Sequence, residues 1–153
     1  RHDFPDDWQI LLVIPEHDTP VSGAMETDIF RESCPVPVEE VREICHEVMM
    51  RLLPGIAEQD LDLFGAAVNR IQEIGFKRIE RERQPHTIQE LPSFLCEAGA
   101  ACAGMSSFGP AVYAITDSAL AGLEAAARDL LGENRAVVFR TRADNHGAIV
   151  RHL

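Results

Sequence analysis

The segment from Gly104 to Pro110 has the residue types of an anion-binding turn. Two glycines bracket the adjacent Ser106 and Ser107, and an apolar stretch follows Pro110. Glycine adopts backbone angles that other residues avoid, so the N–H groups of such a turn can converge on one anion. The pattern predicts a phosphate- or sugar-binding turn, with a plain hairpin turn as the alternative. The residues that we expect to bind are Gly104, Met105, Ser106, Ser107 and Gly109.

The polar segment 20–30 is the second candidate, because it lies between an expected strand and an expected helix, where loops often line sites. Ser22 and Gly23 offer a hydroxyl and backbone donors, and Glu26 could orient a substrate or hold a metal ion. The alternative is a long surface connection. We expect these three residues to form a wall that faces the serine turn.

Basic residues gather between positions 77 and 83, where they alternate with Glu80 and Glu82. This alternation is typical of a salt-bridged surface segment. Lys77 and Arg78 come just after Gly75 and are the better candidates for a phosphate contact.

The chain contains no complete sequence motif for a metal site, a nucleophilic active site or a P-loop. The six histidines are scattered, so no dedicated zinc site and no metal-ligand set is expected. Nucleophile-elbow and P-loop lysine motifs are absent. The cysteines lack the Cys-x-x-Cys spacing and lie in apolar segments, which predicts buried free thiols. They are Cys34, Cys45, Cys96 and Cys102.

Composition bounds the class of protein. The 153 residues are 46% hydrophobic, enough for one domain with a mainly aliphatic core. A formal charge of −11 argues against a nucleic-acid surface. No apolar run is long enough to cross a bilayer, so we expect a cytoplasmic protein without membrane or nucleic-acid partners.

Hydrophobic periodicity gives the elements that must position these residues. We expect strands at 8–14, 100–105, 111–116 and 136–140, the first of them covered on both faces. Helices are expected at 38–53, at 58–74 with Gly75 as the stop, and at 117–131 with Asp117 as the cap. Another helix begins with a capping box at 87–90 and either kinks at Pro92 or starts after it. This order predicts an α+β fold, a ferredoxin-like split βαβ sandwich with additional helices.

Several segments together resemble the β-ribofuranosylaminobenzene 5′-phosphate synthases, a family within the GHMP kinase superfamily. The resemblance spans nearly the whole chain, and its most specific part is Met-Ser-Ser-Phe-Gly-Pro-x-Val-Tyr. The matching segments are Ser22-Gly23 with Glu26 and Phe30, Cys34–Pro37, Phe64-Gly65 with Ile71-Gln72 and Phe76-Lys77, Gly104–Pro110, and Arg142–Ala148. The resemblance implies a fold of the GHMP kinase C-terminal type for residues 1–153 as a single domain.

The resemblance also implies an activity. Such enzymes join the ribose 5-phosphate unit of phosphoribosyl pyrophosphate to 4-aminobenzoate or 4-hydroxybenzoate, and they release pyrophosphate and CO2. The product feeds archaeal methanopterin biosynthesis, and Mg²⁺ steadies the pyrophosphate. The serine turn would correspond to the third glycine-rich motif of this ATP-binding superfamily, with Ser106 and Ser107 at positions that usually carry glycine.

The main nucleotide-phosphate loop of the superfamily is absent, so the chain is expected to be a fragment that lacks an N-terminal domain and to be inactive by itself. A homo-oligomer is a further expectation. Two other functions remain open. One is an ATP-dependent small-molecule kinase of the same superfamily, and the other is a non-enzymatic ligand-sensing or dimerisation domain.

Overall fold

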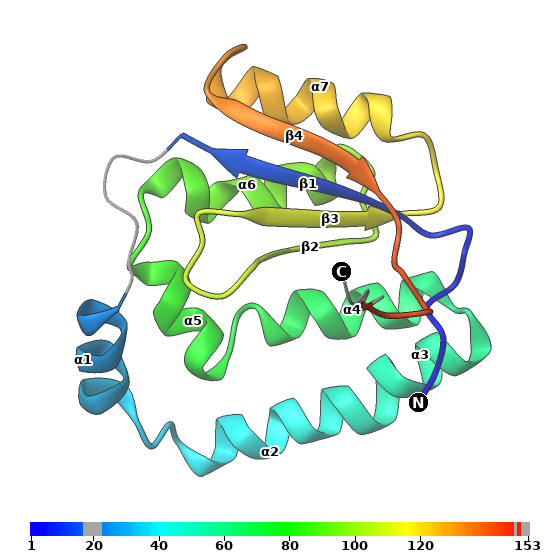
Figure 1. Ribbon diagram of the computed structural model, residues 1–153. Coiled ribbons are helices and arrows are strands. Elements are labelled where there is room, and N and C mark those ends of the chain that lie inside the picture. The colour runs from blue at the N-terminus through cyan, green and yellow to red at the C-terminus, as the bar shows by residue number, and fades with distance from the viewer. Residues whose placement is uncertain (17–22, 149, 151–153) are drawn as a thin grey trace.

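Four antiparallel strands form the central sheet of the computed structural model (Figure 1), which describes residues 1–16, 23–148 and 150. They are β1 (Gln9–Pro15), β2 (Cys102–Met105), β3 (Val112–Thr116) and β4 (Ala136–Thr141). Their order in the sheet is β2-β3-β1-β4, so β3 lies between the two strands that the first helices connect. This split βαβ arrangement confirms the predicted ferredoxin-like α+β fold.

Two helices cover one face of the sheet, namely α6 (His86–Glu97) and α7 (Leu120–Leu131). Leu11 and Val13 of β1 are fully buried on this face, together with Leu91 of α6. Alternate residues of a strand point to opposite faces, so the alternating burial of β1 assigns these two side chains to the main core.

Among the described residues, the other face of the sheet is covered at one end only. There α4 (Leu61–Ile71) brings Phe64 against Trp8, with their ring centroids 5.0 Å apart. Val137 and Phe139 of β4 point to the same side and are 58% and 49% exposed. The prediction that the first strand is covered on both faces therefore holds for its first residues and not for its last.

A long helix runs along the side of α4 that lies away from the sheet (Figure 1). It consists of α2 (Val38–Glu47), a π-helical turn at Val48–Leu52, labelled η1, and α3 (Leu53–Glu58). In the π turn the Leu53 N–H bonds to the Val48 carbonyl, five residues back. Pro54 follows and has no N–H to continue the regular pattern, which accounts for the wider turn.

The structure corrects the expectations for two segments. Residues 24–33 form a helix, α1 (Ala24–Ser33), where a surface connection was the alternative. Gly75 does not stop the preceding helix, because α4 ends at Ile71 and Gly75 is the first residue of α5 (Gly75–Glu82). Gly75 has a φ of 61°, so glycine serves here to begin a helix after a sharp change of direction.

Two expected caps do not form. Helix α7 begins at Leu120 with Ala119 at its N-cap, so Asp117 does not cap it. Helix α6 begins at His86, with Pro85 at the N-cap and no side-chain cap, and it contains Pro92. It therefore starts before the expected capping box rather than after Pro92.

The cysteines differ in exposure. Cys102 is buried and Cys96 is half-buried, whereas Cys34 and Cys45 are exposed. The prediction of buried thiols is therefore wrong for the last two, because the helix face that carries Cys45 points away from the core. In the ranges that the structure describes, no helix is long and apolar enough to span a bilayer.

Candidate functional site

Strand β2 leads directly into the serine turn. Its last residues, Gly104 and Met105, are buried, whereas Ser106 and Ser107 are exposed. The Ser106 N–H bonds to the Ala111 carbonyl at 2.8 Å, and the Gly109 N–H bonds to the Ser106 carbonyl at 2.8 Å. Ser107 has a φ of 48° and Gly109 a φ of 76°, the left-handed region that tight turns use. The turn thus presents two serine residues to solvent.

Two side chains hold the turn from its inner side by donating hydrogen bonds to its carbonyl groups. The Lys77 ammonium donates to the carbonyls of Met105 and Ser107 at 3.1 Å each, and it lies 2.6 Å from Glu80 Oε2. Gln84 Nε2 donates to the Phe108 carbonyl. The two carbonyls accept hydrogen bonds from Lys77, whereas the contact with Glu80 is an ion pair that offsets the charge of the ammonium. Lys77 therefore positions the turn, while its phosphate contact stays a prediction.

An aromatic cluster joins the turn to two helices. The rings of Phe30 on α1 and Phe76 on α5 are stacked, with centroids 4.3 Å apart. Phe108 of the turn meets both rings edge-on, at 6.0 and 5.8 Å. Edge-to-face and stacked aromatic pairs stabilise contacts beyond the area that they bury. Through this cluster the structure brings α1 to the side of the serine turn.

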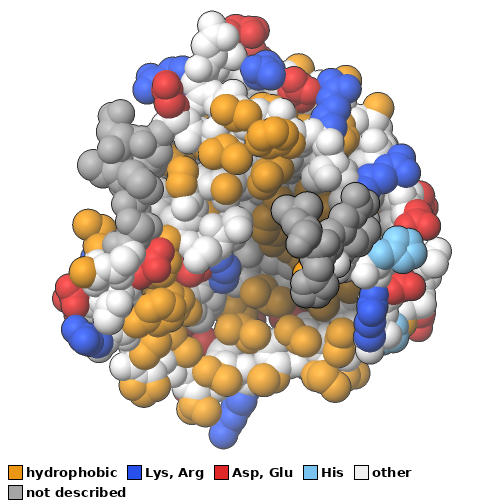
Figure 2. All heavy atoms as spheres, in the orientation of Figure 1, with side chains coloured by type: hydrophobic (Ala, Val, Ile, Leu, Met, Phe, Trp, Pro, Cys, Tyr) orange, Lys and Arg blue, Asp and Glu red, His pale blue; other side chains and the backbone are white. Residues whose placement is uncertain are grey.

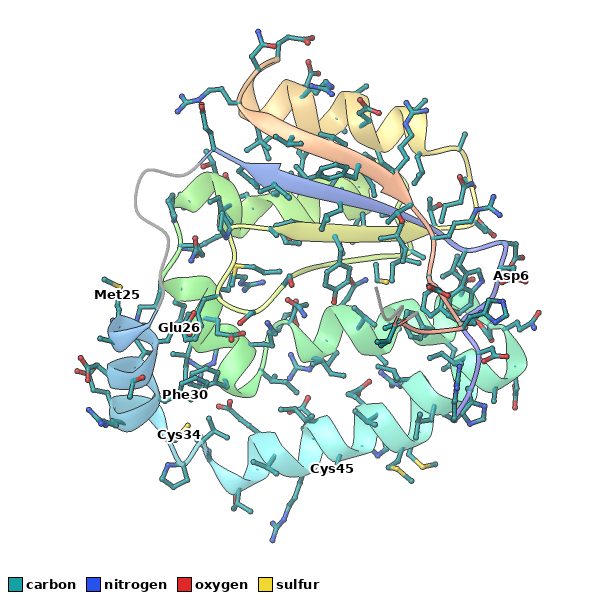
Figure 3. All side chains as sticks on the ribbon, in the orientation of Figure 1. Asp6, Met25, Glu26, Phe30, Cys34 and Cys45 are labelled. Atoms are coloured by element: carbon teal, nitrogen blue, oxygen red, sulfur yellow. The ribbon has the colours of Figure 1, made fainter. Side chains whose placement is uncertain are left out.

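The second candidate segment lies at the start of α1. Gly23 is the N-cap of the helix, with a φ of 61°, and Glu26 is half-buried in its first turn. Figure 3 shows Glu26 and Phe30 on the side of α1 that faces α5, and Met25 on the opposite side. Ser22 lies outside the described residues. The aromatic cluster brings α1 near the turn, no hydrogen bond or ion pair among the described residues joins Glu26 to the turn, and the facing wall stays a prediction.

The position of α5 depends on a carboxylate of α2. Glu40 accepts a hydrogen bond from the Gly75 N–H at 2.6 Å and from the Arg78 guanidinium at 3.1 Å. The hydrogen bond to Glu40 raises the pKa of Arg78. Arg78 also pairs with Glu82, so its donors already have partners within the helices that support the site.

Helix α4 binds the outer edge of β2 through two side-chain amides. Asn69 donates to the Ala101 carbonyl at 3.1 Å and accepts from the Ala103 N–H at 3.1 Å. Gln72 Oε1 accepts from the Met105 N–H at 2.9 Å. These bonds replace the strand that would otherwise continue the sheet, and they fix the strand from which the turn emerges.

Gly104 has a packing role that the sequence interpretation missed. A Cβ atom at this position would lie 2.6 Å from Cδ of Gln72 and 2.7 Å from the hydroxyl of Tyr113. Only glycine fits without moving both side chains. Burial raises the pKa of Tyr113 to about 12, so its hydroxyl stays neutral beside the strand. Gly104 thus leaves room for the Gln72 and Tyr113 side chains, whereas Gly109 allows the left-handed backbone conformation of the turn.

Sequence reasoning gave no supporting role to the residues that hold the turn from behind, although all but Gln84 lie in segments that carry the resemblance. They are Phe30, Gln72, Phe76, Gln84 and Phe108. A signal existed for Gln72, because it falls within the expected helix 58–74, where a polar amide among apolar residues is usually bonded to backbone. Periodicity gave no comparable signal for the aromatic cluster, whose rings come from three separate segments.

A metal site is not evident near the turn. Across the described ranges, no group of three or more His, Cys, Asp or Glu side chains could hold a metal ion. A hollow of about 530 Å³ lies at the opposite end of the sheet and contains four carboxylates. They belong to Asp7, Asp60, Asp62 and Asp117. Their charge disfavours a phosphate there, whereas the serine turn has a lysine beneath it.

The chain is similar to three curated archaeal proteins, each called beta-ribofuranosylphenol 5′-phosphate synthase. Identity is 45% to the Methanothermobacter thermautotrophicus protein, over 98% of this chain and 45% of the relative. It is 47% to that of Archaeoglobus fulgidus, over 96% and 45%, and 43% to that of Methanocaldococcus jannaschii, over 78% and 35%. The chain spans less than half the length of these relatives.

Solved structures share the fold. Homoserine kinase from Cytophaga hutchinsonii superposes with a TM-score of 0.62 at 15% identity, covering 92% of this chain and 42% of the kinase. L. major mevalonate kinase in complex with R-mevalonate gives 0.61 at 15% identity, covering 87% and 41%. The family model described as GHMP kinases C terminal matches residues 52–131, more than half of the chain. The chain therefore belongs to the GHMP kinase C-terminal family.

Proposed function

We propose that this chain is the C-terminal part of a β-ribofuranosylphenol 5′-phosphate synthase. The observation that carries the proposal is the 43–47% identity to three proteins of that name. The reaction would join phosphoribosyl pyrophosphate to 4-hydroxybenzoate or 4-aminobenzoate. A ring carbon forms a bond to the anomeric carbon of the ribose, pyrophosphate leaves, and the carboxylate departs as CO2.

In this proposal the serine turn binds the phosphorylated sugar. Ser106 and Ser107 are exposed, and their hydroxyls can donate to phosphate or ribose oxygens. The Lys77 ammonium lies under the turn, where it bonds to two turn carbonyls and pairs with Glu80, and it holds the turn in place. Hydrogen bonds to a charged group contribute about 1.5–3 kcal/mol each. The turn would therefore act mainly in binding.

The rest of the site would come from the part of the full-length protein that this chain does not cover. The open face of the sheet carries Leu12, Ile14, Val137 and Phe139, which pair across β1 and β4. Val137 and Phe139 are half-exposed, and apolar surface of this kind favours burial by another domain. We infer that the upstream domain packs on this face next to the serine turn.

Magnesium would steady the pyrophosphate, as the resemblance implies. Among the described residues, no three His, Cys, Asp or Glu side chains lie together as ligands for such an ion. Because the relatives are archaeal, we also propose that the enzyme serves methanopterin biosynthesis in the cytoplasm. An ATP site, like the main nucleotide-phosphate loop of the superfamily, would lie in the part of the full-length protein that precedes this chain.

The test uses the full-length protein with Ser106→Ala and Ser107→Ala combined. Release of CO2 from carboxyl-labelled 4-hydroxybenzoate with phosphoribosyl pyrophosphate is measured at several concentrations of the latter. We expect kcat/KM to fall by about 100-fold or more, since two charge-assisted hydrogen bonds are lost. Ser118→Ala is the matched control, because Ser118 is an exposed serine on the connection from β3 to α7. Its kcat/KM should be unchanged.

Two results would contradict the proposal. ATP-dependent phosphorylation of a small molecule without CO2 release would assign the protein to the kinases of the superfamily. Full synthase activity in the double serine variant would remove the turn from the substrate site and leave the synthase assignment intact.

A further inference from the structure

Three carbonyl groups of the serine turn are held by side chains from α5 and the residues after it. Lys77 Nζ donates to the carbonyls of Met105 and Ser107 at 3.1 Å each. Gln84, which follows α5, donates from Nε2 to the Phe108 carbonyl. These carbonyls therefore have their partners within the chain, and a ligand of the turn would bind to its remaining polar groups.

The turn also has two N–H groups without a partner among the described residues. The Gly109 N–H bonds to the Ser106 carbonyl at 2.8 Å, which closes a β-turn with Ser107 and Phe108 at its centre. In the described part of the chain, neither central N–H donates a hydrogen bond. A trans peptide group points its C=O and its N–H in opposite directions. The Phe108 N–H therefore points away from Lys77, which holds the Ser107 carbonyl.

Glu80 is the buried partner of the Lys77 ammonium. Its side chain is 7% exposed, and its Oε2 lies 2.6 Å from Lys77 Nζ. That oxygen has no other partner among the described residues, so the ion pair is the contact that compensates its burial. The two residues lie three positions apart on α5, on the same side of the helix. Glu80 thus fixes the place of the ammonium that holds the turn.

An ion pair on α5 that is more exposed serves as a comparison. Arg78 pairs with Glu82 at 3.5 Å, and the two side chains are 37% and 58% exposed. Exposed pairs of this kind contribute little, because water and salt screen them. A buried carboxylate with one partner restricts the ammonium more strongly, since moving the ammonium would leave buried charge unpaired.

The surroundings offer little net positive charge to an anion. On the face that Figure 2 shows, the Lys and Arg side chains of the described residues are scattered among Asp and Glu side chains and form no basic patch. The Lys77 ammonium itself is offset by Glu80. An anion at the turn would therefore depend on nearby N–H and O–H donors, as in the backbone nests that bind phosphate.

We propose that Glu80 is a positioning residue for the anion site of the serine turn and that the Phe108 N–H is one of the donors of this site. Glu80 holds the Lys77 ammonium, and the ammonium holds the Ser107 carbonyl. The same peptide group then directs the Phe108 N–H toward the ligand. The identity of the ligand, a phosphorylated sugar, rests on the proposed function.

The first test measures steady-state kinetics of the full-length protein with Glu80→Met, which keeps the length of the side chain and removes the acceptor. We expect the KM for phosphoribosyl pyrophosphate to rise about tenfold, because a hydrogen bond to a charged ligand is misdirected. The KM for 4-hydroxybenzoate and kcat should change little. Glu82→Met is the matched control on the same helix and should leave all three constants unchanged.

The fold of the variant is checked by thermal unfolding. Lys77 is 27% exposed, so its ammonium can turn to water when Glu80 is replaced. Glu80→Gln keeps the shape and one acceptor oxygen. It should show a smaller rise in the same KM, and it provides the comparison if the methionine variant unfolds.

The second test observes the Phe108 N–H directly and needs no turnover. Labelling with carbonyl-¹³C serine and ¹⁵N-phenylalanine selects each phenylalanine that follows a serine, which in this chain are Phe94 and Phe108. Loss of a signal in Phe108→Leu assigns it. Titration of the full-length protein with inorganic phosphate should move the Phe108 amide proton downfield and leave Phe94, inside α6, unchanged. In Glu80→Met the same shift should require about tenfold more phosphate.

Three results would overturn the positioning role. Equal changes in KM from Glu80→Met and Glu82→Met would mean that the buried pair has no special part. A lower KM for phosphoribosyl pyrophosphate in Glu80→Met would mean that the released Lys77 ammonium binds the phosphate itself. A Phe108 signal that does not respond to phosphate would remove its N–H from the site. By contrast, a responding signal in a protein without synthase activity would support the positioning role and contradict the proposed function.

Discussion

The two edge strands of the sheet differ in whether side chains bond to their outer backbone groups. On β2 all four residues are buried, and the amides of Asn69 and Gln72 bond to the outer edge of the strand. On β4 most residues are exposed, and no side chain of the described residues bonds to its backbone. Side-chain amides of a helix can thus close a sheet edge as another strand would. The closed edge carries the serine turn, and the open edge is available to a neighbour.

The largest expected effect is the loss of the Asn69 amide. Asn69→Ala leaves the Ala101 carbonyl and the Ala103 N–H without partners beside a buried strand, which should lower the free energy of unfolding by about 2–4 kcal/mol. Urea denaturation measures the change. Thr141→Ala on β4 is the control and should change stability by about 0.5 kcal/mol or less. Equal effects at both edges would contradict the comparison.

The next largest effect is a fall in the free energy of unfolding at alkaline pH. Burial raises the pKa of both Cys102 and Tyr113 to about 12, from ordinary values of 9.0 and 10.0. The unfolded chain releases these protons first, so the stabilisation is complete below about pH 9 and is lost as the pH rises toward 12. Between pH 8 and 10.5 the two groups together should lower the free energy of unfolding by about 3 kcal/mol, of which Cys102 contributes the larger share.

Tyr113→Phe provides the control for this pH dependence. It removes the titrating hydroxyl and keeps the ring, so the fall in stability above pH 9 should become shallower in denaturation curves recorded at a series of pH values. An unchanged slope would show that Tyr113 ionises equally easily in the folded chain.

A smaller loss of stability is expected when a side chain is added where α4 lies close to the segment before β2. A Cβ at Gly65 would lie 2.6 Å from the Ala101 carbonyl oxygen, so Gly65→Ala should destabilise by about 1–2 kcal/mol after the gain in helix propensity. Gly122→Ala in α7 meets nothing within 4 Å and should stabilise instead, by up to about 1 kcal/mol. Thermal unfolding of both variants gives the sign directly.

The smallest effect is expected on the open side. Val137→Thr should change the stability of the 153-residue chain by about 0.5 kcal/mol or less, because the side chain is 58% exposed. Val112→Thr, at a fully buried position of β3, should cost about 1–3 kcal/mol. Similar losses at the two positions in urea denaturation would mean that the open face is covered within the chain itself.

The sequence was sufficient for the strands and for α2 and α7, because their apolar residues follow clear periods. It was insufficient for α1, whose only buried residue is Ile29. Gly75 shows a different difficulty, since a glycine with positive φ can either end one helix or begin the next. The neighbouring Glu40 decides between them, and its position depends on tertiary packing.

The candidate site was predicted in part. Ser106 and Ser107 are exposed in a tight turn, as a binding role requires, and their contact with a ligand stays a prediction. Lys77 bonds to turn carbonyls, partners that residue type alone does not specify, and its expected contact with phosphate stays a prediction. Sequence spacing identified the turn, whereas its support comes from side chains far apart in the chain.

The π turn at Val48–Leu52 holds one residue more than a regular turn of the long helix. Because the wider winding absorbs this residue within the turn, deleting one residue there should restore an unbroken α-helix with nearly the same rotation between α2 and α3. Glu40 would then keep its contact with Gly75. The helix therefore tolerates a change of length at this point without a change in the faces that its two halves present.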